Sequence, residues 1–87
     1  MTNRLALVVD DSKTARVTLK RMLENHGVET DTVDSAPAAI DYLAGKMPAV
    51  IFMDHMMPDM YGFEALEAIK GNPDTATIPI MMYTSKG

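Results

Sequence analysis

The chain has 87 residues, a formal net charge of −4 and no cysteine, which is the size of one small domain and excludes both a disulfide framework and a cysteine-based zinc site. The lack of cysteine fits a reducing setting, so a cytoplasmic location is expected. No apolar stretch approaches the roughly 20 residues of a membrane span, and the N-terminal residues lack the apolar core of a signal peptide. The acidic balance argues against direct binding to nucleic acid.

Strands and helices are predicted to alternate along the chain, beginning with a strand over 5–9. That apolar run and a second one over 49–53, which Asp54 closes, are typical of parallel strands that are buried on both faces. Residues 28–33 are more polar and predict an edge strand. Residues 78–83 predict a fourth strand, near whose start Pro79 is tolerated. No repeat or linker interrupts this alternation.

Serine and glycine residues mark the ends of the predicted helices. Asp11 and Ser12 are both good N-cap types for the first helix, and Ser35 is a plausible cap for the second. Gly27 suits the left-handed conformation that ends a helix, and Gly45 ends the second one. A third helix is predicted over 62–70. In the second helix, the residues expected on the buried face are Ala36, Ala39, Ile40 and Leu43.

This alternation predicts an α/β fold with a parallel sheet and right-handed crossovers. The expected strand order is 2-1-3-4, which makes the crevice between the first and third strands the topological switch point. Ligands of open α/β sheets bind in such a crevice, beyond the carboxyl ends of the strands. Asp10 and Asp11 follow the first strand and Asp54 ends the third. The sequence therefore predicts three carboxylates at this crevice.

Carboxylates this close repel one another, so either some are protonated or a cation neutralises them. Oxygen ligands without histidine or cysteine favour a hard cation, and Mg²⁺, which keeps positions open for phosphate oxygens, is the expected one. Asp54 is then a candidate nucleophile that accepts a phosphoryl group. Thr84, which follows the fourth strand, is a candidate hydrogen-bond donor to a phosphoryl oxygen, and Ser85 is a weaker one.

Three segments together resemble the receiver domain of two-component response regulators: VVDDS at 8–12, MDHMMPDMYG at 53–62 and MYTS at 82–85. They occur in the family's order and spacing and span almost the whole chain. The aspartate pair is a weak signal alone, whereas the second segment is a strong one. The resemblance implies a flavodoxin-like, doubly wound fold and phosphorylation by a histidine kinase or phosphotransfer protein. It also implies a signalling switch rather than a turnover enzyme.

The same resemblance implies roles for individual residues. Asp54 is the implied phosphoacceptor, and Thr84 is the implied switch hydroxyl that moves toward the phosphoryl group. Asp11 is the implied direct Mg²⁺ ligand, and Asp10 is a ligand that acts mainly through water. Asp54 and the main-chain carbonyl of Met56 are implied to complete the set of protein ligands.

The chain departs from the family pattern at its C-terminal end. It stops at Gly87, just after the fourth strand, so it is expected to be one receiver domain over 1–87 that lacks the last helix, strand and helix. The lysine that the family carries on its fifth strand has no counterpart, since Lys86 lies too soon after Thr84. The family's aromatic switch residue is missing too, and Tyr83 is interpreted as sheet packing rather than as a substitute.

The truncation also predicts a bare surface. With the first helix on one face of the sheet and the other two on the opposite face, the third and fourth strands are uncovered on the first-helix side. Either Val50 and Phe52 or Ile51 and Met53 are expected to face water there. An apolar surface beside an unprotected edge strand predicts self-association, strand exchange with a second copy, or a missing C-terminal portion.

Other functions stay open. A truncated receiver that holds a metal but cannot switch would act as a dimerisation or interaction module. A Mg²⁺-dependent phosphohydrolase would use Asp54 as its nucleophile, but Met56 stands where a second acid is needed. A flavin or nucleotide site is disfavoured because the loop 10–14 is acidic and has no glycine. His26 and His55 are both expected at the surface.

Overall fold

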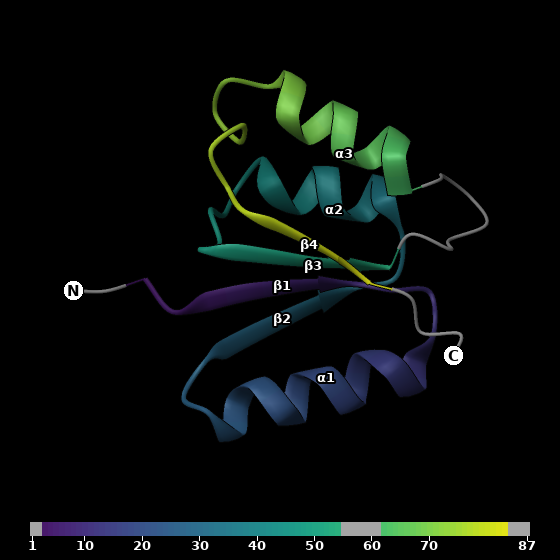
Figure 1. Cartoon of the computed structure of the whole chain (residues 1–87), viewed down its shortest axis with the longest axis vertical. Helices are drawn as coiled ribbons and strands as arrows, with labels where there is room; N and C mark the ends of the chain where they lie inside the picture. The colour runs from purple at the N-terminus through teal and green to yellow at the C-terminus, as the bar shows by residue number, and fades with distance from the viewer. Residues whose placement is uncertain (1–2, 55–61, 84–87) are drawn as a thin grey trace.

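The computed structural model describes residues 3–54 and 62–83, with only the backbone described at 62–65. Strands and helices alternate along the described chain, as the sequence predicts (Figure 1). The strands are β1 (Leu5–Val9), β2 (Glu29–Val33), β3 (Val50–Asp54) and β4 (Ile80–Tyr83). The helices are α1 (Lys13–Asn25), α2 (Ala36–Leu43) and α3 (Gly62–Gly71). None of the described helices is long and apolar enough to cross a membrane.

The sheet is parallel throughout, and its strand order is β2-β1-β3-β4, which confirms the predicted order 2-1-3-4 of a flavodoxin-like sheet. The register places Val8 of β1 opposite Thr32 of β2 on one side and opposite Phe52 of β3 on the other. β1 and β3 are therefore neighbours whose carboxyl ends meet at one edge of the sheet. This edge is the predicted switch point.

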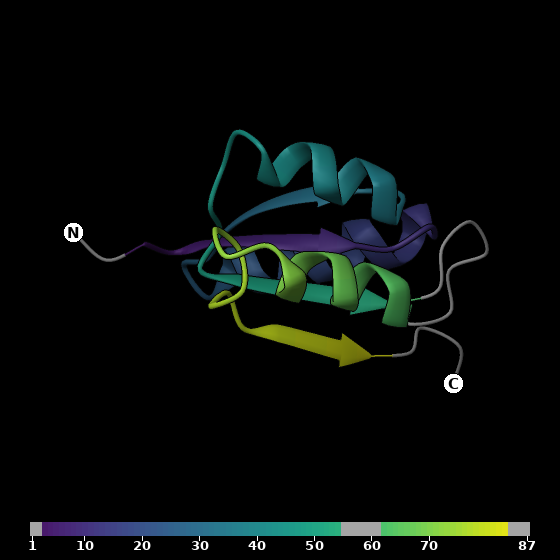
Figure 2. The same cartoon turned by 90° about the horizontal axis from the view of Figure 1, so that it is seen from above.

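The helices form two layers, with α1 on one face of the sheet and α2 and α3 on the other (Figures 1 and 2). Because side chains alternate along a strand, every second residue of β1 and β3 points into the α2–α3 layer. Fully burying an aliphatic side chain there contributes about 1.5–3 kcal/mol. The core cluster comprises Leu7, Val9, Ala36, Ala39, Leu43, Ile51, Met53, Ile69 and Ile78.

Of the two caps predicted for the first helix, the structure selects Ser12 rather than Asp11, and the predicted cap Ser35 of the second helix is confirmed. The Ser12 hydroxyl accepts the backbone N–H of Ala15 at 3.3 Å, and the Ser35 hydroxyl accepts that of Ala38 at 3.2 Å. Gly27 follows α1 with a φ of +79°, the left-handed conformation that favours glycine. The first cap matters for the site, because it starts α1 directly after the carboxylates that follow β1.

Two details of the sequence prediction are wrong. β4 begins at Ile80 rather than at residue 78, because the N–H of Ile78 donates to the carbonyl of Thr75 in the preceding turn (3.1 Å) and Pro79 has no N–H to give. Ile40 is 39% exposed instead of lying on the buried face of α2. It borders a shallow hollow of about 340 Å³ between α2 and α3 that no described side chain fills.

One half of the sheet is open on the α1 side. α1 packs against β1 and β2, and no described element covers β3 and β4 on that face (Figure 2). The structure decides between the two predicted pairs of β3 residues. Ile51 and Met53 are fully buried beneath α2 and α3, whereas Val50 and Phe52 are half-buried and face the open side. Their neighbour Met81 on β4 is 55% exposed.

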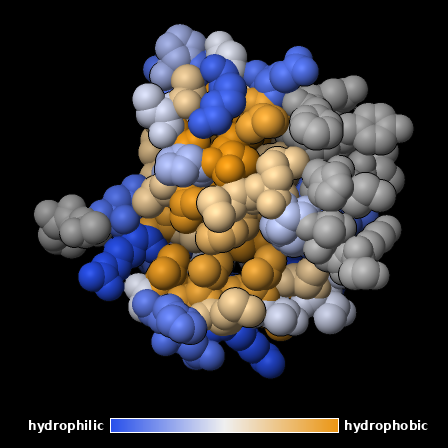
Figure 3. Space-filling view, viewed as in Figure 1, coloured by the Kyte–Doolittle hydropathy of each residue, from blue (hydrophilic) through white to orange (hydrophobic). Residues whose placement is uncertain are grey.

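We call this surface the open half-face; it comprises Val50, Phe52, Met81 and Tyr83. Tyr83 belongs to it because it lies two residues beyond Met81 on the same strand. Figure 3 shows hydrophobic side chains gathered at the exposed β4 edge, between α1 and α3. No residue of α1 is fully buried, as expected for a helix that contacts only half of the sheet.

Candidate functional site

The three predicted carboxylates come together at the carboxyl ends of β1 and β3. One side-chain oxygen from each of Asp10, Asp11 and Asp54 lies within 4.8 Å of the others. Asp10 and Asp54 are fully buried, and Asp11 is exposed. We call these residues the acidic cluster. The sequence predicted this grouping because parallel strands end at the same edge of the sheet.

Asp10 is held in place by its backbone as well as its side chain. Its N–H donates to the carbonyl of Val33 on β2 (3.2 Å), and its own carbonyl accepts Nη1 of Arg16 from α1 (2.8 Å). Its Oδ1 accepts the backbone N–H of Ser12 at 2.8 Å. The first turn of α1 therefore fixes the direction in which the Asp10 carboxylate points.

The second oxygen of Asp10 is bound by a residue that the sequence analysis assigned to sheet packing. The Tyr83 hydroxyl donates to Oδ2 of Asp10 at 2.7 Å, across the end of β3. Burial raises the pKa of Tyr83 far above its usual value, and the hydrogen bond and the charge of Asp10, with the charges of Asp54 and Asp11, raise it further. The phenol therefore keeps its proton at any ordinary pH and acts as a donor.

The sequence carries only part of the signal for this contact, a long phenol at the end of the fourth predicted strand. Asp54 and Tyr83 pair in the sheet register, and both lie on the α1 side, as does Asp10 beyond β1. A phenol is long enough to cross one strand, whereas most other side chains at that position are not. The sequence places Tyr83 next to Thr84 at the end of the strand, but it does not show on which face of the sheet the phenol lies.

The electrostatics of the acidic cluster favour a cation. Two unit charges 4.8 Å apart repel by about 0.9 kcal/mol in water and by about 3.5 kcal/mol at the effective dielectric constant of about 20 found near protein surfaces. Carboxylate oxygens are the ligands that Mg²⁺ prefers, and one exposed member leaves the cluster open to solvent. The donor set thus fits Mg²⁺, with Asp10, Asp11 and Asp54 as the residues that would hold it.

Several predicted site residues lie outside the residues that the structure describes. They include Met56, whose carbonyl was implied as a ligand, and Thr84, the implied switch hydroxyl. His55, Ser85 and Lys86 lie outside as well. Their roles stay predictions from the sequence.

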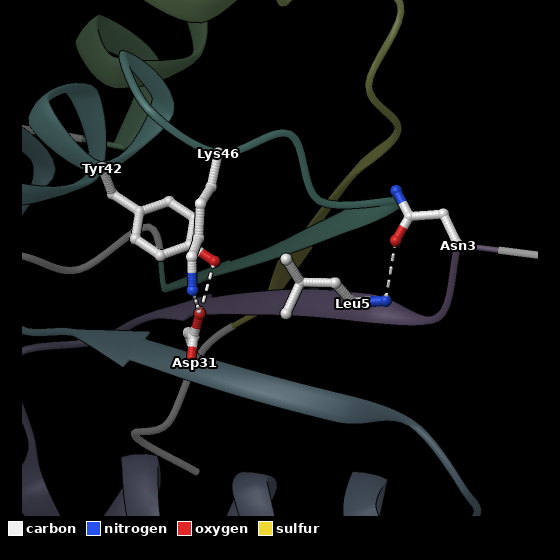
Figure 4. A network of polar contacts seen from close by, with 5 residues as sticks. All are labelled: Asn3, Leu5, Asp31, Tyr42 and Lys46. Carbon is white, nitrogen blue, oxygen red and sulfur yellow. Dashed lines mark hydrogen bonds and ion pairs between the residues drawn. The ribbon is translucent and has the colours of Figure 1, made fainter.

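A second polar network, which the sequence analysis missed, lies away from the acidic cluster (Figure 4). The Tyr42 hydroxyl donates to Oδ2 of Asp31 at 2.6 Å, and Nζ of Lys46 donates to the same oxygen at 3.2 Å. The Tyr42 hydrogen bond, with smaller contributions from Lys46, lowers the pKa of Asp31, while burial and Asp31 raise that of Tyr42. This network ties the end of α2 to β2, and we interpret it as structural.

Comparisons with known proteins agree with the geometry. A family model described as the response regulator receiver domain matches residues 6–87. Among curated proteins, the chain is similar to PilH of Pseudomonas aeruginosa, with 32% identity over 92% of this chain and 66% of PilH. It is also similar to PilG of the same organism, with 35% identity over 92% of this chain and 59% of PilG. The chain thus spans less than two thirds of the length of these relatives.

Solved structures show the same likeness. The N-terminal domain of a response regulator receiver protein from Methanoculleus marisnigri JR1 superimposes with a TM-score of 0.90 and 38% identity, over 94% of this chain and 67% of that one. The chemotaxis response regulator CheY4 of Vibrio cholerae gives a TM-score of 0.88 and 31% identity, over 93% of this chain and 68% of that one. Strand order and helix placement therefore match those of known receiver structures.

Proposed function

Because this chain belongs to the family of response regulator receiver domains, we propose that it is a phosphoacceptor in a two-component or phosphorelay system, with Asp54 as the acceptor. The observation that carries the proposal is the placement of Asp54: it ends β3, is fully buried, and lies within 4.8 Å of two further carboxylates. Asp11 is the exposed member of the acidic cluster, so a reaction partner would approach Asp54 from that side.

The proposed step moves one phosphoryl group. A carboxylate oxygen of Asp54 attacks the phosphorus of a phosphohistidine on the donor protein, and the phosphorus–nitrogen bond breaks. The histidine nitrogen keeps the electron pair and takes up a proton, while a mixed anhydride forms at Asp54. Phosphoryl transfer of this kind needs positioning and charge neutralisation more than covalent machinery.

The acidic cluster supplies the positioning. Asp10, Asp11 and Asp54 would hold Mg²⁺, with the main-chain carbonyl of Met56 as the further ligand implied by the family. When bound, Mg²⁺ would neutralise charge on the phosphoryl oxygens and on the carboxylates. The protein's own part is to hold Asp10 through Ser12 and β2, and to place the buried carboxylate of Asp54 at the end of β3 beside it.

The remaining roles are also proposed. Thr84 would donate its hydroxyl to a phosphoryl oxygen and so report phosphorylation. The chain would catalyse its own phosphorylation and dephosphorylation without being a turnover enzyme. Its phosphodonor would be a histidine kinase or a phosphotransfer protein, it would not bind nucleic acid itself, and its location would be cytoplasmic.

The test is the intact mass of the protein after incubation with acetyl phosphate, with and without Mg²⁺. A phosphoryl adduct that requires Mg²⁺ is expected on the wild type and on Asp31→Asn, whose carboxylate lies outside the acidic cluster. No adduct is expected on Asp54→Asn. An adduct of equal yield on Asp54→Asn would overturn the assignment of the acceptor.

The open half-face supports a second candidate function. Exposed Met81 and half-buried Phe52 form an apolar surface beside β4, which is the outer strand of the described sheet. A non-switching receiver would use this surface to associate with a second copy while the acidic cluster holds a metal. Mg²⁺ binding without any adduct would favour this function over the first.

A further inference from the structure

The Tyr83–Asp10 hydrogen bond has a consequence for the metal site, and the inference rests on the proposed Mg²⁺-dependent function. Both carboxylate oxygens of Asp10 are engaged: Oδ1 by the N–H of Ser12 at 2.8 Å and Oδ2 by the hydroxyl of Tyr83 at 2.7 Å. The Ser12 contact belongs to the backbone. The Tyr83 contact belongs to a side chain that reaches over from β4, on the far side of β3, and side chains can move.

We propose that the Tyr83 hydroxyl competes with the cation for Asp10, so that this hydrogen bond weakens Mg²⁺ binding and Mg²⁺ binding in turn loosens Tyr83 from the acidic cluster. A donor proton and a cation both stabilise the same negative charge. Once a divalent cation draws electron density from the carboxylates, Asp10 is a weaker acceptor, so the hydrogen bond loses strength. A contact that is stronger in the metal-free state lowers metal affinity, by thermodynamic linkage.

An opposing effect has to be weighed. Hydrogen bonds to metal ligands often strengthen binding because they orient the ligand. Here the orientation of Asp10 does not depend on Tyr83, since the Ser12 N–H fixes Oδ1 and the Asp10 N–H is bonded to Val33 of β2. Asp10 is also fully buried, which restricts its rotamers. Competition for charge is therefore the larger of the two effects.

The coupling reaches the open half-face. The ring of Tyr83 is part of that surface, beside Phe52 and Met81, while its hydroxyl lies at the acidic cluster. Coupling between two sites is reciprocal. Occupancy of the cluster would therefore change the position of one member of the apolar surface, and a partner bound to that surface would change Mg²⁺ affinity.

The test is the Mg²⁺ affinity of three proteins, measured by titration calorimetry. Tyr83→Phe removes the hydroxyl and keeps the ring. Tyr42→Phe is the matched control, because it removes the same kind of phenol–carboxylate bond at Asp31, away from the cluster. We expect Tyr83→Phe to bind Mg²⁺ about threefold to tenfold more tightly than the wild type. The reason is that the wild type loses part of a charge-assisted hydrogen bond when it passes from the metal-free to the Mg²⁺-bound state, whereas Tyr83→Phe has no such bond to lose. Tyr42→Phe should match the wild type.

Equal or weaker binding by Tyr83→Phe would overturn the competition while leaving the metal site intact. No binding by the wild type would overturn the metal site and the competition together. A second measurement does not need Tyr83→Phe to fold. The chain has three tyrosines and no tryptophan, so a protein with Tyr42→Phe and Tyr61→Phe absorbs through Tyr83 alone. Saturating Mg²⁺ should shift its absorption to shorter wavelength, as for a phenol that donates more weakly; an unchanged spectrum contradicts the inference.

Discussion

Replacing Asp10 by asparagine should stabilise the metal-free protein. Asparagine is nearly the same shape, so its oxygen can still accept the Ser12 N–H and its amide can donate to the Tyr83 oxygen. What disappears is one negative charge in a buried position beside Asp54 and near Asp11. The sign of the effect depends on whether this repulsion exceeds the loss of charge-assisted hydrogen bonding.

The magnitudes favour repulsion. The pair of Asp10 with buried Asp54 contributes about 3.5 kcal/mol at 4.8 Å and an effective dielectric constant of about 20, and the pair with exposed Asp11 about 0.9 kcal/mol in the water limit. Two hydrogen bonds that become neutral lose about 1 kcal/mol each. The net expectation is a gain of about 2 kcal/mol in the free energy of unfolding.

Urea denaturation in the presence of EDTA measures this gain. Asp31→Asn is the control, because the Asp31 carboxylate is stabilised by Tyr42 and Lys46 rather than repelled, and neutralising it should lower stability. With saturating Mg²⁺ the free energy of unfolding of the wild type should rise by most of its deficit relative to Asp10→Asn. That of Asp10→Asn should rise by less. A loss of more than about 1 kcal/mol for Asp10→Asn in EDTA would refute the electrostatic account of the cluster.

Two further predictions concern other parts of the structure. Tyr42→Phe should lower the free energy of unfolding by about 1 kcal/mol at neutral pH, because the hydrogen bond to Asp31 is lost. This hydrogen bond lowers the pKa of Asp31 below 3.8, so its contribution to stability is present above that pH and disappears as the pH falls through the folded-state pKa. Urea denaturation at neutral pH and at successively lower pH below 3.8 checks it, and a loss that stays constant as the pH falls would contradict it. Met81→Glu should weaken self-association in sedimentation experiments with less than about 0.5 kcal/mol change in stability, whereas Met22→Glu, at an equally exposed position on α1, should not. Equal effects of the two changes would show that the open half-face is not the contact surface.

The fold could be predicted because its signals are local. The apolar runs that became β1 and β3, the serine caps and Gly27 each act over a few residues, and the alternation of strand and helix then allows few topologies. The acidic cluster followed from the same topology, since Asp10 and Asp54 had only to end neighbouring parallel strands. Ile40 was wrongly predicted to be buried. Helical spacing predicts on which side of α2 a residue lies, but not how much of that side α3 covers.

The contacts that the sequence did not reveal join residues far apart in the chain. Tyr83 reaches Asp10 only when the register of β4, the side of the sheet and the rotamer of a long side chain all agree. The Asp31–Tyr42–Lys46 network similarly needs the end of α2 to lie over β2. The sequence left two alternatives for the β3 residues on the open half-face, Val50 with Phe52 or Ile51 with Met53. The choice between them depends on which face of the sheet the first residue of β3 points to.

The most direct test of the central claim is to locate the phosphoryl group. After incubation with acetyl phosphate and Mg²⁺, borohydride reduces an aspartyl phosphate to homoserine, and trypsin separates residues 47–70, which contain Asp54, from residues 5–13, which contain Asp10 and Asp11. Fragment masses then assign the position. Homoserine at 54 alone is the predicted result. Homoserine at 10, 11 or 59, or none in a protein that binds Mg²⁺, would contradict the assignment of Asp54 as the phosphoacceptor.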